Sequence, residues 1–244
     1  MKKYGIIGRP LGHSFSKKYF EDKFAEEALS DCVFENHELE TIDQVKTLIS
    51  DPDLKGFCIT IPYKRAIIPY LTEMSDAVRA MDACNCVQIK KGKLIGYNTD
   101  VIGFEQSFVP QLNKNDHYAL ILGTGGAASA VCYVLEKLGL AYKFVSRSPS
   151  NEQFSYEEIK SPELLKQYTV IINCSPVGTY PKEEQAPDIA YDLLTEQHYL
   201  YDLVYNPPLT RFLQNGQANG ARIQNGYPML AIQAEANWVN WNKE

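Results

Sequence analysis

The stretch "ALILGTGGAASAVCYVLEKLG", residues 119–139, consists of an apolar strand, a glycine turn and a long apolar helix. It matches the pattern G-x-G-x-x-A with Gly123, Gly125 and Ala128. Glycine lets the backbone turn sharply and approach a pyrophosphate, while the N-terminus of the following helix supplies N–H donors and the positive end of its dipole. The pattern alone is a weak signal, but a strand before it and a helix after it are the context that supports it. The stretch predicts a dinucleotide-binding α/β domain.

The next strand, "YKFVSRS", ends about 24 residues after Gly123. Sites for NAD place an Asp or Glu in this neighbourhood, where it binds the ribose hydroxyls. This chain has Arg147 there, between Ser146 and Ser148. A guanidinium can give charge-assisted hydrogen bonds to a 2′-phosphate and can stack on adenine. The pattern favours NADP over NAD, and the alternative is an ordinary exposed loop arginine.

Short apolar runs alternate with helix-like stretches on both sides of this motif, which is typical of βαβ units and a mostly parallel sheet. Strands are expected in "YGIIG", "CVFENHEL" and "GFCIT", and helices over 15–29, after Thr41 and near Lys64. The alternating segments around Lys91 and Gly92 predict a hairpin at an antiparallel edge. A helix is expected over 99–112, and the helical period of "GYPMLAIQAEANWVNW" predicts a last helix that packs on the first domain.

Composition narrows the functional classes. The 244 residues are 45% hydrophobic and 22% charged, with a formal net charge of -6. Nucleic-acid or membrane-surface binding would need a basic face, so neither partner is expected. The first residues lack a signal-peptide core, and no long apolar run follows, which predicts a cytoplasmic protein.

The six cysteines are Cys32, Cys58, Cys84, Cys86, Cys132 and Cys174. They lie in apolar runs of a chain too large to need disulfide staples, which predicts reduced core thiols. Cys84 and Cys86 have neither a second pair nor a nearby histidine to complete a zinc site, so no metal is expected.

The first half of the chain offers polar groups of the kind an alcohol-oxidising nicotinamide enzyme needs, since such an enzyme must take up the hydroxyl proton and orient its substrate. Each has an ordinary alternative: a helix cap for Ser14 or Thr99, a surface-reaching side chain for Lys64, a turn for Asn85. The candidates are Ser14, Ser16, Thr60, Lys64, Asn85, Asn98, Thr99 and Asp100.

Taken together, these motifs resemble the shikimate dehydrogenase family nearly end to end. The resemblance is carried, in order, by "GHSFS", "TIPYK", "ACNCV", "GYNTDVIGF", "LGTGGAASA", "SRS", "INCSPVGT", "DLVYNPPLTRFL" and "NGYPMLAIQAEANW". It implies an N-terminal α/β substrate domain with a mostly parallel sheet, residues 1–101 plus 227–244, and an NADP-binding Rossmann-type domain, residues 102–226. The implied reaction is the NADPH-dependent, reversible reduction of 3-dehydroshikimate to shikimate in aromatic amino-acid biosynthesis.

The resemblance also implies roles for individual residues. Lys64 and Asp100 would form the catalytic pair, although sequence leaves open which of the two carries the proton, because a coupled pair titrates as a unit. Substrate would be bound by Ser14, Ser16, Thr60, Asn85, Tyr205 and Gln233. Cofactor would be bound by Gly123, Gly125, Gly126, Ala127, Ser146, Arg147, Ser148 and Gly226.

The chain departs from the family pattern at several positions. "KKYFEDKF" follows Ser16 where the family has a proline and then His-Asn, and Asn151 stands where the family has a second arginine after Arg147. The second change predicts weaker binding of the 2′-phosphate. The "NCSPVGT" loop has a proline at a position where the family often has threonine or serine, and no functional meaning is attached to it.

Two alternative functions remain open. One is a quinate/shikimate dehydrogenase that prefers NAD, against which Arg147 argues. The other is a catalytically silent shikimate sensor, which would need neither Lys64 nor Asp100. A small-molecule substrate is the expected partner, and the chain is expected to be a monomer or a homodimer.

Overall fold

The computed structural model describes residues 1–12, 15–126 and 128–243. The chain divides into two compact units, the first formed by Met1–Ile102 and Ala231–Glu244 and the second by Gly103–Leu230. The domain boundary predicted after residue 226 lies directly before the last helix of the chain, Tyr227–Trp241. The boundary between the two compact units lies inside that helix, between Leu230 and Ala231. Across the described ranges, no helix combines the length and apolar character that a membrane span requires.

The first unit contains one six-stranded sheet with the order β2-β1-β3-β5-β6-β4. Its elements are β1 (Lys2–Gly8), α1 (Phe15–Glu26), β2 (Cys32–Glu38), η1 (Ile42–Gln44), α2 (Val45–Leu48), β3 (Leu54–Ile59), α3 (Tyr63–Ala66), η2 (Ile68–Tyr70), β4 (Glu73–Met74), α4 (Asp76–Met81), β5 (Cys86–Lys90) and β6 (Lys93–Tyr97). Strands β2, β1 and β3 are parallel, and β5 is antiparallel to both β3 and β6.

The hairpin between β5 and β6 turns at Lys91 and Gly92, as predicted. Both residues have positive φ, 50° and 76°, which is the backbone of a type I′ turn. Its predicted place at the sheet edge is wrong, because the two-residue strand β4 pairs in parallel with β6 and forms the edge instead. So short a strand carries no alternating pattern that sequence could reveal.

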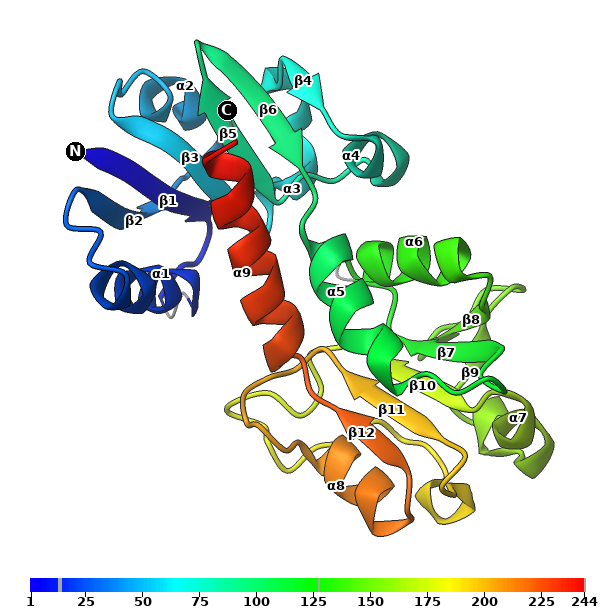
Figure 1. Cartoon of the computed structure of the whole chain (residues 1–244). Helices are drawn as coiled ribbons and strands as arrows, with labels where there is room; N and C mark the ends of the chain where they lie inside the picture. Colours follow the sequence, from blue (N-terminus) through cyan, green and yellow to red (C-terminus); the bar gives the residue numbers. More distant parts are fainter. Residues whose placement is uncertain (13–14, 127, 244) are drawn as a thin grey trace. The chain divides into compact units, whose positions relative to one another are not determined.

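Hydrophobic clusters cover both faces of this sheet. One cluster holds side chains of the helices α1 and α9 (Tyr227–Trp241). Figure 1 shows these two helices on the same side of the strands. In this cluster Trp241 stacks on Tyr4, and its indole nitrogen donates to the carbonyl oxygen of Val87 at 3.0 Å. Gly56 makes room for the indole, since a Cβ there would run into the ring. The C-terminal part of α9 therefore packs on the first unit, as predicted.

The second unit contains an all-parallel sheet with the order β12-β11-β10-β7-β8-β9. Its elements are α5 (Asp100–Phe108, which begins in the first unit), η3 (Val109–Gln111), β7 (Tyr118–Leu122), α6 (Ala128–Leu138), β8 (Ala141–Ser146), β9 (Phe154–Ser155), η4 (Glu158–Lys160), α7 (Pro162–Gln167), β10 (Val170–Asn173), η5 (Tyr191–Leu193), β11 (Tyr199–Asp202), α8 (Arg211–Ala218) and β12 (Arg222–Gln224).

This strand order is that of a doubly wound Rossmann fold, and the α/β fold class with a Rossmann-type domain is confirmed. Helices α5 and α6 lie on one face of the sheet and α7 and α8 on the other (Figure 1). Along β11 the side chains alternate between these layers: Tyr199 and Tyr201 contact Phe108 of α5, while Leu200 joins the core under α7 and α8. The order reverses between β7 and β10, where ligands of such sheets bind beyond the carboxyl ends of the strands.

Candidate active site

The Lys64 ammonium and the Asp100 carboxylate meet in the first unit. Lys64 lies on the short helix α3 that follows β3, and Asp100 is the first residue of α5. Lys64 Nζ donates to Asp100 Oδ2 at 2.6 Å, and the two side chains are 30% and 19% exposed. Both side chains are thus partly exposed, as groups that exchange protons with a substrate must be.

Asn85 holds the second oxygen of Asp100. Its Nδ2 donates to Asp100 Oδ1 at 2.9 Å, so each carboxylate oxygen has its own donor. The backbone of Asn85 lies between two strands, because its carbonyl accepts from Ile59 N and its N–H donates to the carbonyl of Tyr97. Asn85 is therefore held by backbone hydrogen bonds between β3 and β6, immediately before β5, and its amide orients the Asp100 carboxylate.

Behind this pair, Thr99 connects Asn85 with Asn237. The Thr99 hydroxyl accepts from Asn85 Nδ2 at 3.0 Å and donates to Asn237 Oδ1 at 2.6 Å. Asn237 Nδ2 in turn donates to Gln233 Oε1, one turn earlier on α9. Sequence reasoning missed Asn237; the available signal was its spacing of four residues from Gln233, which puts both on one helix face.

The structure brings four of the predicted substrate and catalytic residues into one connected group: Lys64, Asp100, Asn85 and, through Asn237, Gln233. Thr60 follows β3 and is half-buried, and Ser16 is buried in the first turn of α1. Ser14 lies outside the described residues. Their substrate contacts stay predictions.

All six cysteine thiols are free. Burial raises the pKa of the Cys84 thiol to about 12 and raises those of Cys58 and Cys86 as well. These thiols are therefore protonated and poorly nucleophilic at neutral pH. The described residues contain no group of three or more His, Cys, Asp or Glu side chains suited to a metal ion.

The predicted cofactor loop follows β7 in the second unit. Gly123 has φ +98°, a conformation that favours glycine, and a Cβ there would approach Ser175 after β10 to 3.2 Å. Gly125 and Gly126 are exposed, and a Cβ on either would meet nothing within 4 Å. Their backbone is thus open to an approaching group, just before the N-terminus of α6 at Ala128. Ala127 lies outside the described residues.

Arg147 is exposed directly after β8. Ser148 N donates to Ser146 Oγ at 3.2 Å, which closes a turn around the arginine. In the described part of the chain, no hydrogen bond or ion pair holds the Arg147 guanidinium. A glycine loop with open backbone and an uncommitted cation at the neighbouring strand end are the groups that a dinucleotide with a 2′-phosphate needs, so these residues fit NADP.

Two loops beyond β10 and β11 are held together by Asp202. Its Oδ1 accepts from Asn173 Nδ2 at 2.9 Å and from Val204 N at 3.0 Å, and its Oδ2 accepts from Thr210 Oγ1 at 2.6 Å. Burial raises the pKa of this carboxyl to about 6. Neither Asp202 nor Asn173 was predicted from sequence to matter.

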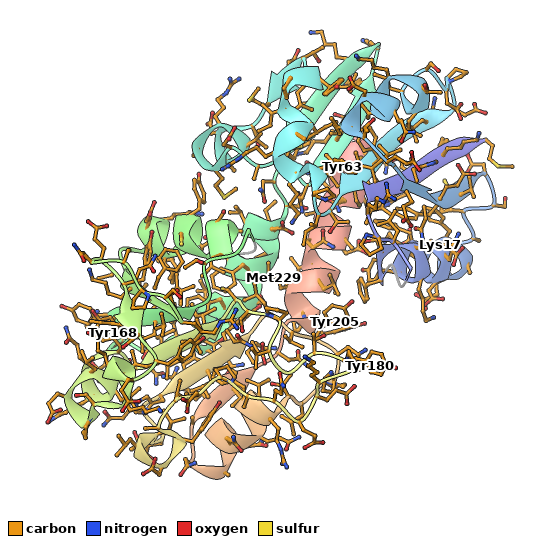
Figure 2. All side chains as sticks on the ribbon, turned by 180° about the vertical axis from the view of Figure 1, so that it is seen from behind. Lys17, Tyr63, Tyr168, Tyr180, Tyr205 and Met229 are labelled. Atoms are coloured by element: carbon orange, nitrogen blue, oxygen red, sulfur yellow. The ribbon has the colours of Figure 1, made fainter. Side chains whose placement is uncertain are left out.

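Tyr205 lies on the loop held by Asp202, and Figure 2 labels it together with Tyr180 of the loop after β10. The two loops contact each other, since Thr179 Oγ1 donates to the carbonyl oxygen of Asn206 at 3.5 Å. Tyr205 is half-buried, and burial raises the pKa of its hydroxyl. Gly226 contacts the start of the same loop, since a Cβ there would run into the carbonyl of Leu203. Tyr205 belongs to the second unit and Ser16 to the first, so their predicted joint binding of a carboxylate stays a prediction.

Comparison with known proteins settles the family. Residues 6–87 match the model described as shikimate dehydrogenase substrate binding domain. "Shikimate dehydrogenase (NADP(+))" of Caldicellulosiruptor bescii is 35% identical over 98% of this chain and 90% of its own length. The chain belongs to the shikimate dehydrogenase family.

Solved structures agree with this assignment over the whole chain. A shikimate dehydrogenase in complex with NADP+ superposes with a TM-score of 0.85 at 28% identity, over 99% of this chain and 90% of the other. The Thermus thermophilus shikimate 5-dehydrogenase, in complex with NADP(H) and shikimate, superposes with a TM-score of 0.84 at 26% identity, over 99% and 94%. The predicted family and its oxidoreductase class are confirmed, and NADP, the predicted cofactor, is the cofactor named for these relatives.

Proposed function

We propose that this member of the shikimate dehydrogenase family catalyses the reversible, NADPH-dependent reduction of 3-dehydroshikimate to shikimate. The observation that carries the proposal is the 2.6 Å contact between Lys64 Nζ and Asp100 Oδ2, with Asn85 on the other carboxylate oxygen. Membership in the family, and relatives named for this activity, support the choice of substrate.

In the reductive direction, NADPH supplies a hydride to the carbonyl carbon when it is bound. The chain's own task is to deliver a proton to the carbonyl oxygen as negative charge develops on it. Lys64 Nζ does this by donating a hydrogen bond and then a proton, while Asp100 keeps the amine oriented and compensates its charge. In the reverse direction, the same pair takes up the hydroxyl proton.

The remaining groups of the first unit orient the ring. Thr60, Asn85, Asp100 and Gln233 bind ring hydroxyls in this proposal, and Ser14 and Ser16 bind the carboxylate with help from Tyr205. In the second unit, the glycine loop with Gly123, Gly125, Gly126 and Ala127 binds the pyrophosphate, Gly226 contributes backbone, and Arg147 with Ser146 and Ser148 binds the 2′-phosphate.

The test is NADPH oxidation with 3-dehydroshikimate, by wild type, Lys64→Ala and Lys93→Ala. Lys64→Ala is expected to lose about 100-fold or more in kcat, the usual scale for a general acid-base group. Lys93 is a matched control, because it also contacts a carboxylate at 2.6 Å, that of Glu73, but both side chains are at least half exposed. Its variant should behave like wild type.

Side-by-side kinetics with quinate and NAD separate the alternatives. A wild type that turns over quinate with NAD better than shikimate with NADP would make the chain a quinate dehydrogenase. A folded wild type that binds shikimate without turnover would make it a sensor. A Lys64→Ala variant as fast as wild type would remove Lys64 from the catalytic pair.

A further inference from the structure

The side chain of Asn237 is completely buried, yet all of its polar atoms are engaged. Its Oδ1 accepts from Thr99 Oγ1 at 2.6 Å, and its Nδ2 donates to Gln233 Oε1 and to Cys58 Sγ, both at 3.2 Å. A buried amide without hydrogen-bond partners would lower the free energy of unfolding, so the three contacts are needed for the side chain to be stable at this position. The three partners come from three parts of the chain: β3, the residue just before α5, and α9 itself.

The donor and acceptor roles in this network follow from one backbone group, the N–H of Thr99. Thr99 N–H donates to the Asn85 side chain at 2.7 Å, so the atom that accepts must be Oδ1. Asn85 Nδ2 then points the other way, with one hydrogen toward Thr99 Oγ1 and one toward Asp100 Oδ1. The Thr99 hydroxyl accepts one of these hydrogens, and its own proton goes to the nearest acceptor, Asn237 Oδ1.

From this geometry we propose that Asn237 is a positioning residue for the reaction. It fixes the Thr99 hydroxyl, which fixes the Asn85 amide and thereby the Asp100 carboxylate that holds Lys64. The Nδ2 group of Asn237 also orients the Gln233 amide, because it holds Gln233 Oε1 toward itself. The proposal rests on the proposed function, because it assigns Asn237 to the machinery around the Lys64–Asp100 pair.

Removing the acceptor at position 237 changes the network in a defined way. In the variant Asn237→Ala, the Thr99 proton has one remaining partner in this group, Asn85 Oδ1 at 3.2 Å. The hydroxyl would then have to rotate away from the geometry in which it accepts from Asn85 Nδ2. The Asn85 amide and Asp100 are left with less restraint, and misplacement of reacting groups by even a fraction of an ångström lowers turnover.

The experiment compares Asn237→Ala with Asn240→Ala. Asn240 is a matched control, because it is also buried on α9, but its Oδ1 accepts from Lys243 Nζ instead of joining the network. Asn237→Ala is expected to lower kcat about tenfold, with a smaller rise in KM, and to weaken shikimate binding several-fold in calorimetry without cofactor. Asn240→Ala should change kcat and shikimate binding by less than twofold, and both variants should bind NADP like wild type.

Two further variants separate positioning from folding. Thr99→Val removes the hydroxyl and should lower kcat like Asn237→Ala, whereas Thr99→Ser keeps it and should retain wild-type turnover; these variants decide the matter if Asn237→Ala does not fold. In a Lys64→Ala background, Asn237→Ala should add less than twofold, because residues that act through one group are not additive.

The outcomes distinguish the two proposals. If Lys64→Ala is impaired but Asn237→Ala and Thr99→Val match the Asn240→Ala control, Asn237 has no positioning role and the proposed function stands. If wild type lacks dehydrogenase activity, the proposed function fails. The shikimate affinities of the variants then still decide whether Asn237 orders the binding groups.

Discussion

Arg147 is the residue on which the proposed preference for NADP depends. It occupies the strand end where an acid would bind the ribose hydroxyls of NAD, and its guanidinium is exposed. Asn151 stands where the family pattern has a second arginine, so the proposed phosphate site has one cation instead of two. Charge-assisted hydrogen bonds contribute about 1.5–3 kcal/mol each, so the preference for NADP should be narrower by about ten- to a hundredfold than with two arginines.

The variant Arg147→Asp should reverse this preference, because it removes the partner of the phosphate and adds an acceptor for ribose hydroxyls. Specificity constants for NADP and NAD, measured on wild type and variant, test this. Arg211→Asp serves as control, since Arg211 on α8 is also an exposed arginine of the second unit but pairs with Glu184. A wild type that prefers NAD, or a ratio that Arg147→Asp leaves unmoved, would take Arg147 out of the cofactor site.

At the scale of elements, the loop between β11 and α8 depends on one buried carboxyl. Asp202 accepts hydrogen bonds from β10, from its own loop and from Thr210, the N-cap of α8. Because burial raises its pKa from 3.8 to about 6, the folded protein keeps a proton that the unfolded chain has already released between about pH 4 and 6. Asp202 thus contributes most to stability below about pH 4, and that contribution is lost as the pH rises through 6.

Comparison of wild type with Asp202→Asn makes this effect measurable. The asparagine retains an acceptor at Oδ1 and does not titrate. The free energy of unfolding of the variant should therefore lack the pH dependence that Asp202 gives the wild type. Between pH 4 and 7 the stability of wild type should fall relative to the variant by up to about 3 kcal/mol, since one pKa unit corresponds to about 1.4 kcal/mol. Urea unfolding across this range is the measurement, and parallel pH profiles would contradict a raised pKa for Asp202.

Gly226 restricts the same loop by close approach. A Cβ at this position would overlap the carbonyl of Leu203, which is backbone and cannot rotate away. Gly226→Ala should therefore lower the free energy of unfolding by about 1–3 kcal/mol, the usual range for overpacking. Gly125→Ala, where a Cβ meets nothing within 4 Å, should change it by no more than about 0.5 kcal/mol. Equal stability of the two variants in thermal unfolding would refute the clash.

At the scale of the whole molecule, the proposed function assigns substrate binding to one unit and cofactor binding to the other. The catalytic pair and its network lie in Met1–Ile102 and Ala231–Glu244, and the glycine loop and Arg147 lie in Gly103–Leu230. The chain crosses between the units twice, once within α5 and once within α9. A substitution in one unit is therefore expected to change the affinity for the ligand of that unit and to leave the affinity for the other ligand nearly unchanged.

Joint replacement of Ser14 and Ser16 by alanine tests this division. Hydroxyl donors can anchor a carboxylate without taking part in hydride transfer, so the variant should raise KM for shikimate about tenfold or more. The dissociation constant for NADP, measured by calorimetry, should stay within about twofold of the wild-type value. Equal weakening of both ligands would show that the serines act in folding.

Sequence determined the fold class because its signals are local. The glycine turn between strand and helix, the Lys91-Gly92 hairpin and the apolar period of the last helix each follow from backbone conformation and side-chain spacing over a few residues. The same locality exposed Lys64, Asp100 and Arg147, since their motifs are short and contiguous. The family resemblance added their roles.

Only the tertiary structure revealed Asn237, Asp202 and the edge strand β4. Asn237 meets Thr99 across 138 residues of chain and Asp202 meets Asn173 across 29 residues, and no local period marks either pairing. A buried polar residue is defined by its partners, which come from other elements that packing brings together. Strand β4 has two residues, too few for alternation, and exists only because β6 offers it an edge. Sequence thus determined the elements that have a local pattern, and packing determined the edge strand β4 and the buried partners of Thr99 and Asn173.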